Sequence, residues 1–169
     1  MQTLQLSRSS LRIAGFLLLS IVTIESGGLY LTRVASGAVE LTGFQVAFAR
    51  AGHAHAGVLV ILSLVALILA DATGLTGVWG YLVRLAIPAA AIGMPAGFFL
   101  SSMGEGRTSP NGLVVLLWLG AVCLTVGVIA LGVALLRAGF SREATSERGT
   151  SEAEAKPAGS VPPEPTAPG

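Results

Sequence analysis

Four long apolar stretches dominate this 169-residue sequence and limit what it can fold into. They cover residues 13–31, 51–70, 78–100 and 113–136, each close to the roughly 20 apolar residues needed to cross a bilayer. Only helices or closed barrels can span lipid, because every backbone polar group must be satisfied there, and these runs lack the alternation of barrel strands. The sequence therefore predicts an all-α fold, a bundle of four transmembrane helices within residues 1–140.

The overall composition agrees with this prediction and excludes several other classes of protein. Charged residues make up 11% of the chain, whereas a soluble domain carries roughly 25%. A net charge of +1 excludes the strongly basic surface of a nucleic-acid-binding protein. Because Cys123 is the single cysteine, the chain has no intramolecular disulfide and no CxxC motif for zinc or redox chemistry.

The segment 141–169 differs sharply from the rest of the chain. It holds five of the eight prolines and almost no large apolar residues. Such a segment cannot bury enough surface to offset the entropy lost on ordering. We therefore expect a disordered C-terminal tail. Its richness in Ala, Gly, Pro and Glu is typical of a bacterial protein from a high-GC genome.

The arginines next to the spans predict the orientation in the membrane. The first span follows a charged start like that of a signal peptide. The small residues that could form a cleavage site, 35–38, however, lie far beyond the apolar run, after Glu25, Tyr30 and Arg33, so we expect a retained anchor. An orientation with both termini inside leaves four arginines near the membrane inside and three outside (Arg8, Arg12, Arg137 and Arg142 against Arg33, Arg50 and Arg107). We therefore expect a multi-pass protein of the plasma membrane with cytoplasmic N and C termini.

Four acidic or basic residues lie within the predicted spans and are the candidates for function, because such residues are costly in lipid (Glu25, His53, His55 and Arg84). If the first span ends near Leu31, Glu25 lies about 9 Å below the membrane surface. The second span enters on the same side, so His53 and His55 lie roughly 3 to 6 Å deep. We therefore take Glu25, His53 and His55 as candidate catalytic residues at the outer end, whereas Arg84 is expected to pair with Asp71 or to reach the inner interface.

The two histidines form an HxH motif whose spacing restricts its chemistry. Residues two apart on an α-helix point about 200° apart, so His53 and His55 cannot both bind one metal ion from a regular helix. We therefore assign no metal site. Three interpretations stay open: hydrogen-bonded residues at the interface, catalytic or proton-handling groups, and ligands of a haem.

Small residues on the third span predict a packing groove. Ala89, Gly93 and Gly97 recur at four-residue spacing, which lets a neighbouring helix backbone approach closely. Pro88 and Pro95 lie in the same span and free backbone carbonyls one turn upstream. The amphipathic stretch 39–48 precedes the second span, and we expect either an interfacial turn or an extension of that span outside the bilayer.

Several motifs resemble known membrane families. The four-span plan, a histidine near the start of the second span, Tyr81 and the stretch 93–96 (Gly-Met-Pro-Ala) resemble the hydroxylaminobenzene mutase family, which implies rearrangement of an aromatic hydroxylamine. The HxH motif is similar to the histidine-bearing helices of haem–copper oxidase subunit one, where the two imidazoles serve separate haems. The general pattern also resembles actinobacterial-type four-span integral membrane proteins without an assigned activity.

The sequence leaves three functions open. The first is a membrane protein with a Glu25, His53 and His55 pocket near the outer face, acting as an isomerase-like enzyme or a proton-handling site. The second is a non-catalytic accessory subunit that packs against a larger membrane complex through the third span. The third is a haem-binding module. The expected partners are the lipid bilayer and either a second copy or a larger membrane complex, with no nucleic acid.

Overall fold

The computed structural model describes residues 5–155, with side chains up to residue 143. Its helices are α1 (Arg8–Ala35), α2 (Gly43–Ala72), α3 (Gly77–Ser101) and α4 (Val115–Ala155), and a short 3-10 helix, η1 (Gly112–Val114), precedes α4. The described residues contain no strand. Each of the four predicted spans lies within these helices, so the predicted four-helix fold is confirmed.

All four helices are long and apolar enough to cross a membrane. Even α3, with 25 residues, is about 38 Å long at the rise of an α-helix, which exceeds the roughly 30 Å of a bilayer's hydrocarbon core. The chain is therefore a membrane protein with transmembrane helices.

Local sequence signals set the helix ends. The Ser7 side chain accepts a hydrogen bond from the Ser10 backbone N–H at the start of α1. Thr42 and Gln45 form a reciprocal capping box at the start of α2, so residues of the amphipathic stretch from Gly43 onward belong to α2. Beyond the ends of α1 and α2, Gly37 and Gly74 adopt φ values of 77° and 69°, which side chains disfavour.

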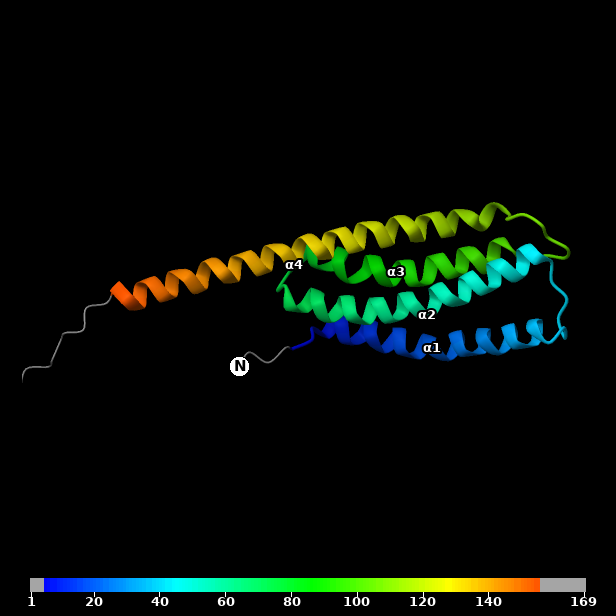
Figure 1. The fold of residues 1–169 in the computed structure, drawn as a ribbon, viewed down its shortest axis with the longest axis horizontal. Helices are drawn as coiled ribbons and strands as arrows, with labels where there is room; N and C mark the ends of the chain where they lie inside the picture. Colours follow the sequence, from blue (N-terminus) through cyan, green and yellow to red (C-terminus); the bar gives the residue numbers. More distant parts are fainter. Residues whose placement is uncertain (1–4, 156–169) are drawn as a thin grey trace, which may run out of the picture. The chain divides into compact units, whose positions relative to one another are not determined.

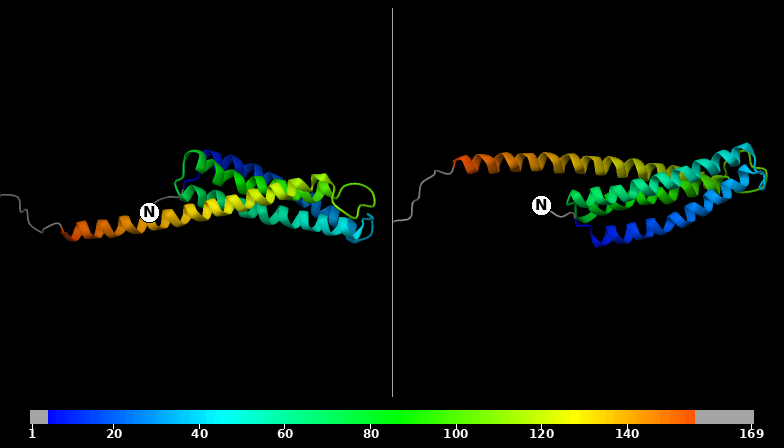
Figure 2. Two further views of the ribbon diagram at one scale, coloured as in Figure 1. Left: turned by 90° about the horizontal axis from the view of Figure 1, so that it is seen from above. Right: turned by 60° about the horizontal axis from the view of Figure 1, so that its bottom comes forward.

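The helices pack in sequence order, with α2 and α3 innermost (Figures 1 and 2). In the most apolar stretch of each helix, about a third of α2 and 44% of α3 is buried, whereas only 6% of α1 is buried. One core cluster joins α1, α2 and α3 around Leu17, Leu59 and Met94. A second joins α2, α3 and α4 around Ala70, Ile87 and Leu131. The outer helices thus leave large apolar surfaces free for lipid.

A buried polar network ties three helices together at the end where α1 begins. Arg84 of α3 forms a 2.7 Å ion pair with Asp71 of α2, and both side chains are almost fully buried, with exposures of 12% and 3%. The second carboxylate oxygen of Asp71 accepts a 2.8 Å hydrogen bond from the Ser7 backbone N–H at the start of α1. Arg84 also donates to the carbonyls of Leu75 and Gly80. The predicted pairing of Arg84 with Asp71 is therefore confirmed.

A second network closes the opposite end. The buried Gln45 side chain donates hydrogen bonds to the carbonyls of Ser102 and Gly104, at 3.0 and 2.7 Å. The Thr42 hydroxyl donates to the Arg107 carbonyl. These contacts bind the start of α2 to the loop that follows α3.

The chain divides into one compact unit up to Leu135 and a second from Leu136 onward. In the second unit, α4 continues as a helix to Ala155, through residues for which the composition predicts disorder. Residues 141–155 contain Ala, Glu and Arg, which favour helices, and the first proline of the segment is Pro157. The remainder of the predicted disordered tail, residues 156–169, lies outside the described residues.

Candidate functional site

The two histidines lie on different flanks of α2, as their spacing predicts. The Nδ1 of His55 lies 2.8 Å from the Ala51 carbonyl. Because a carbonyl oxygen only accepts hydrogen bonds, Nδ1 carries a proton and donates it to this carbonyl. The His55 ring packs on Phe98 of α3, with 5.0 Å between ring centroids. His55 therefore belongs to the contact between α2 and α3.

His53 faces α1 instead. A Cβ atom placed on Gly28 would lie 3.3 Å from the Cε1 atom of His53, and one on Gly27 would lie 3.5 Å from Nδ1. The two consecutive glycines of α1 thus provide the space that the imidazole fills. His53 is half-buried, and no described residue forms a hydrogen bond or ion pair with it. Its ring nitrogens are therefore available to another molecule.

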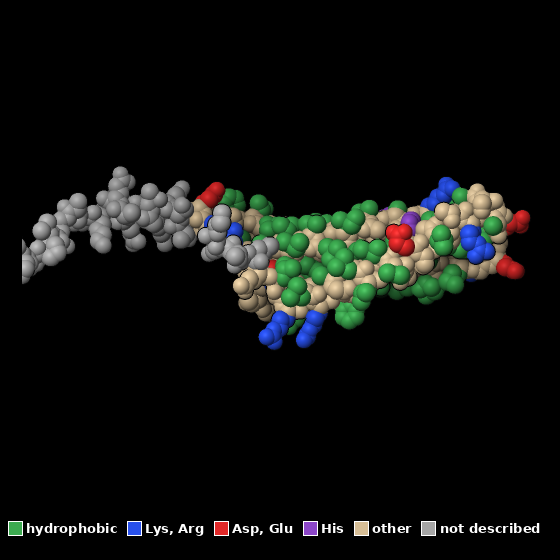
Figure 3. Space-filling model, turned by 90° about the horizontal axis from the view of Figure 1, so that it is seen from below, with side chains coloured by type: hydrophobic (Ala, Val, Ile, Leu, Met, Phe, Trp, Pro, Cys, Tyr) green, Lys and Arg blue, Asp and Glu red, His purple; other side chains and the backbone are tan. Residues whose placement is uncertain are grey.

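Glu25 is exposed on α1 and has no hydrogen bond or ion pair with any described residue. It lies three residues before Gly28, so it is a neighbour of that glycine on the helix surface, one turn deeper in the predicted span. The structure therefore brings Glu25 and His53 to the same region without joining them, and it separates both from His55. In the view of Figure 3 an acidic and a histidine side chain appear next to each other, nearer to the charged end on the right than to the one on the left.

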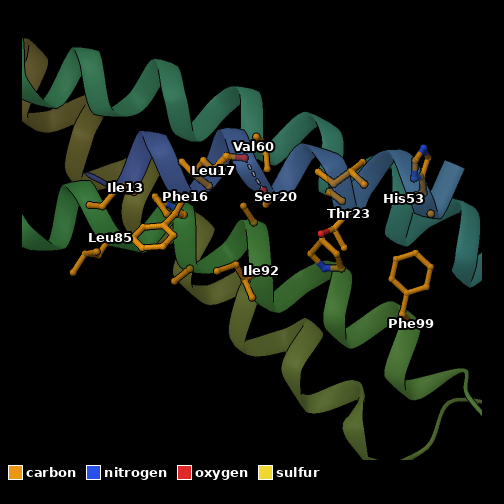
Figure 4. Close-up of a pocket in the computed structure, with 17 residues that line it drawn as sticks. Ile13, Phe16, Leu17, Ser20, Thr23, His53, Val60, Leu85, Ile92 and Phe99 are labelled. Carbon is orange, nitrogen blue, oxygen red and sulfur yellow. Dashed lines mark hydrogen bonds between the residues drawn. The ribbon is translucent and has the colours of Figure 1, made fainter. Parts of the chain in front are cut away.

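An apolar groove with a volume of about 780 Å³ runs between α1 and α3 beside His53. Its walls come from α1 and α3, and α2 contributes His53, Ala56 and Val60 (Figure 4). The remaining lining side chains are almost all apolar, and the polar ones are Ser20 and Thr23. The Ser20 hydroxyl donates to the Leu17 carbonyl at 2.7 Å and is thereby satisfied within its own helix. His53 and Thr23 are therefore the polar side chains of the groove that can form hydrogen bonds with a bound molecule.

The groove is long and narrow rather than round. Its lining extends from Ile13 to Gly27 on α1 and from Leu85 to Phe99 on α3. Fourteen residues of helix correspond to about 21 Å. Figure 4 shows His53 and Phe99 at one end of the groove and Leu85 and Ile13 towards the other, with the imidazole turned towards α1. This shape suits a long apolar chain with its polar group near His53.

The three small residues of the predicted packing groove divide between two surfaces. Gly93 and Gly97 face α4, where the Cβ atom of an alanine at position 97 would lie 2.2 Å from the Leu117 backbone nitrogen. Ala89 is exposed and lines the groove towards α1. Gly93 and Gly97 thus lie where α3 and α4 approach closely, whereas Ala89, one turn before Gly93, lies at the edge of the groove towards α1.

The groove itself was not predicted. Phe16, Thr23 and Phe99 line it, but nothing in the sequence marks them, since apolar residues facing lipid and those facing a groove look alike. Among the described residues there is no group of three His, Cys, Asp or Glu side chains able to hold a metal ion. No family model, curated protein or solved structure matches the chain. Any function beyond that of a membrane protein with four transmembrane helices therefore has to be argued from the residues of this chain.

Proposed function

We propose that this protein binds a membrane-soluble amphipathic molecule, whose apolar chain fills the groove between α1 and α3 and whose polar group meets His53. The observation that carries this proposal is a half-buried imidazole without a partner in the described chain, placed at one end of a long apolar groove. The groove volume of about 780 Å³ lies within the range of ligand sites in proteins. A neutral imidazole both donates and accepts hydrogen bonds, so it suits a hydroxyl, carbonyl or carboxyl head group.

The chemistry proposed for the site is proton transfer. His53 is the group best placed to exchange a proton with the polar part of the ligand, as in an isomerisation. Glu25, one turn deeper on α1, does not line the groove, so no step of this chemistry is assigned to it. His55 is assigned a structural role, because its Nδ1 is committed to the Ala51 carbonyl and its ring to Phe98.

Filling the groove tests the proposal. Ala89 lines the groove and is exposed, so Ala89→Phe adds bulk there without disturbing the core. In proteoliposomes containing a photoactivatable fatty acid, we expect this variant to lose most of the labelling of α1 and α3 peptides. Ala54→Phe, an exposed position of α2 outside the groove, is the matched control and should label like the original protein.

The same assay examines His53. We expect His53→Leu to reduce labelling by the fatty acid but not by a photoactivatable alkane of equal length, because only the acid has a polar group for the imidazole. His55→Leu should leave both patterns unchanged. Uniform labelling of all lipid-facing peptides, insensitive to Ala89→Phe, would refute a specific site.

We further propose that the protein lies in a bacterial plasma membrane with both termini in the cytoplasm. The support is the arginine distribution, with Arg8, Arg12, Arg137 and Arg142 on the proposed inner side. This orientation puts His53 in the outer half of the bilayer. Alkaline phosphatase, active only outside the cytoplasm, should be inactive when fused after Gly169 and active when inserted at Gly106. The opposite pattern would reverse the orientation and move the His53 end of the groove to the inner leaflet.

A further inference from the structure

One face of α1 combines apolar residues with a single acid. We call it the Glu25 face, and it consists of exposed positions spaced alternately four and three residues apart (Leu11, Gly15, Leu18, Val22, Glu25 and Leu29). Leu18, Val22 and Leu29 are 54%, 72% and 70% exposed. The groove uses the other side of α1, so the two surfaces are separate.

Glu25 is the anomaly of this face. It precedes the end of the predicted span, Leu31, by six positions, or about 9 Å of helix, which puts it within the apolar part of the span. Ionisable side chains at such depth almost always face the interior and pair there, because lipid provides no hydrogen bonds. Since no described residue pairs with Glu25, a partner for its carboxyl group has to come from outside the described part of the chain.

We propose that a second copy of this chain covers the Glu25 face, with the two α1 helices packed in parallel about a two-fold axis along the membrane normal. Such an axis brings every residue of α1 to the depth of its own counterpart. A pair of carboxyl groups that holds at least one proton suits this symmetry, because the protonated oxygen donates a hydrogen bond and an oxygen of the other carboxyl group accepts it. The carboxyl groups of the two Glu25 side chains can therefore form hydrogen bonds with each other, and no other chemical group is needed.

The other residues of the Glu25 face are also consistent with packing against α1 of a second copy. Its four–three spacing is that of helices paired in parallel with a left-handed crossing, where one polar residue fixes the register. Gly15 has no side chain, and a Cβ atom there would meet nothing within 4 Å, so a partner helix has room to approach. Hydrogen bonds between polar side chains and close packing at small residues are the interactions that associate helices in lipid.

Cysteine cross-linking locates the interface. Cys123 is the single cysteine, so Cys123→Ser provides a background into which one cysteine is introduced at a time. In membranes, oxidation should join two copies through Leu18→Cys or Val22→Cys on the Glu25 face. Phe16→Cys is the matched control, because Phe16 is 76% exposed on the same helix but lines the groove. Equal cross-linking at positions 16 and 18 would overturn the proposal.

The role of Glu25 is measured by self-association of the full chain in lipid vesicles. Glu25→Leu should weaken the dimer by about 5- to 30-fold, the effect of losing an interhelical hydrogen bond in model peptides. Glu25→Gln, which keeps a donor and an acceptor, should associate nearly as well as the original chain. An unchanged dimer in Glu25→Leu, or a monomer at all protein concentrations, would contradict the proposal, as would cross-linking of position 18 to a different protein. Fatty-acid labelling of the groove is a separate readout, so failure of either proposal leaves the other distinguishable.

Discussion

Replacing Gly97 with alanine is expected to disrupt the packing of α3 against α4. The new Cβ atom would lie 2.2 Å from the Leu117 backbone nitrogen and 2.6 Å from its Cα. Both are backbone atoms, so no side-chain rotation relieves the clash and the two helices have to move apart. Overpacking of a well-packed core costs about 1–3 kcal/mol, occasionally more, and we expect the upper part of this range. The free energy of unfolding in detergent micelles, measured by denaturant titration, checks the prediction.

Two other glycines provide graded controls for this substitution. Gly93→Ala would bring its Cβ to 3.4 Å from the Gly120 Cα, an ordinary contact, and should have a small effect. Gly132→Ala in α4 meets nothing within 4 Å and should be tolerated fully. If all three variants unfolded alike, the loss would reflect glycine in general rather than the close approach of α3 and α4.

Removing the Asp71 carboxylate is the second change with a large expected effect. Asp71→Ala would leave the Arg84 guanidinium buried without its partner and would free the Ser7 backbone N–H. Breaking a buried ion pair on one side costs about 3–5 kcal/mol. We therefore expect a strongly destabilised protein, with hydrogen exchange increased first at the start of α1, where Ser7 loses its acceptor.

A double substitution separates the ion pair from the shape of its site. Asp71→Leu combined with Arg84→Leu removes both charges and should be closer in stability to the original protein than Asp71→Ala, because no uncompensated charge is left. Glu105→Ala, an exposed acid in the loop after α3, is the control for general loss of charge and should change little. A double variant less stable than the single one would show that Arg84 contributes mainly through its bonds to the Leu75 and Gly80 carbonyls.

Most of the fold could be predicted because one physical requirement dominates it. Apolar runs of membrane-spanning length have no alternative to helices, and the short connections leave antiparallel packing of neighbours. The pairing of Arg84 with Asp71 followed from their position at one end of adjacent spans. The exception is residues 141–155, where the prolines of the whole segment suggested disorder. There α4 continues as a helix to Ala155, before the first proline of the segment, Pro157.

The site was less predictable because depth in the membrane does not fix the rotation of a helix about its axis. The 200° separation of His53 and His55 depends on α2 alone, and the structure confirms it. Whether Glu25 faces those histidines depends on how α1 is rotated against α2, which the Gly27–Gly28 pair and the buried Leu17 determine. The groove depends on the gap between α1 and α3, two helices that are not neighbours in sequence.

The way in which α1 is held against its neighbours affects access to the groove. At its first turn, Ser7 is hydrogen-bonded to the buried Asp71 carboxylate, whereas further along the helix Leu17 is its one buried hydrophobic residue. Moving α1 therefore costs least at the end that lies beside His53. A small tilt of α1 about Ser7 would widen the gap to α3 there. For the proposed function, this means that a hydrophobic ligand would reach the imidazole by diffusion within the leaflet, without passing through water.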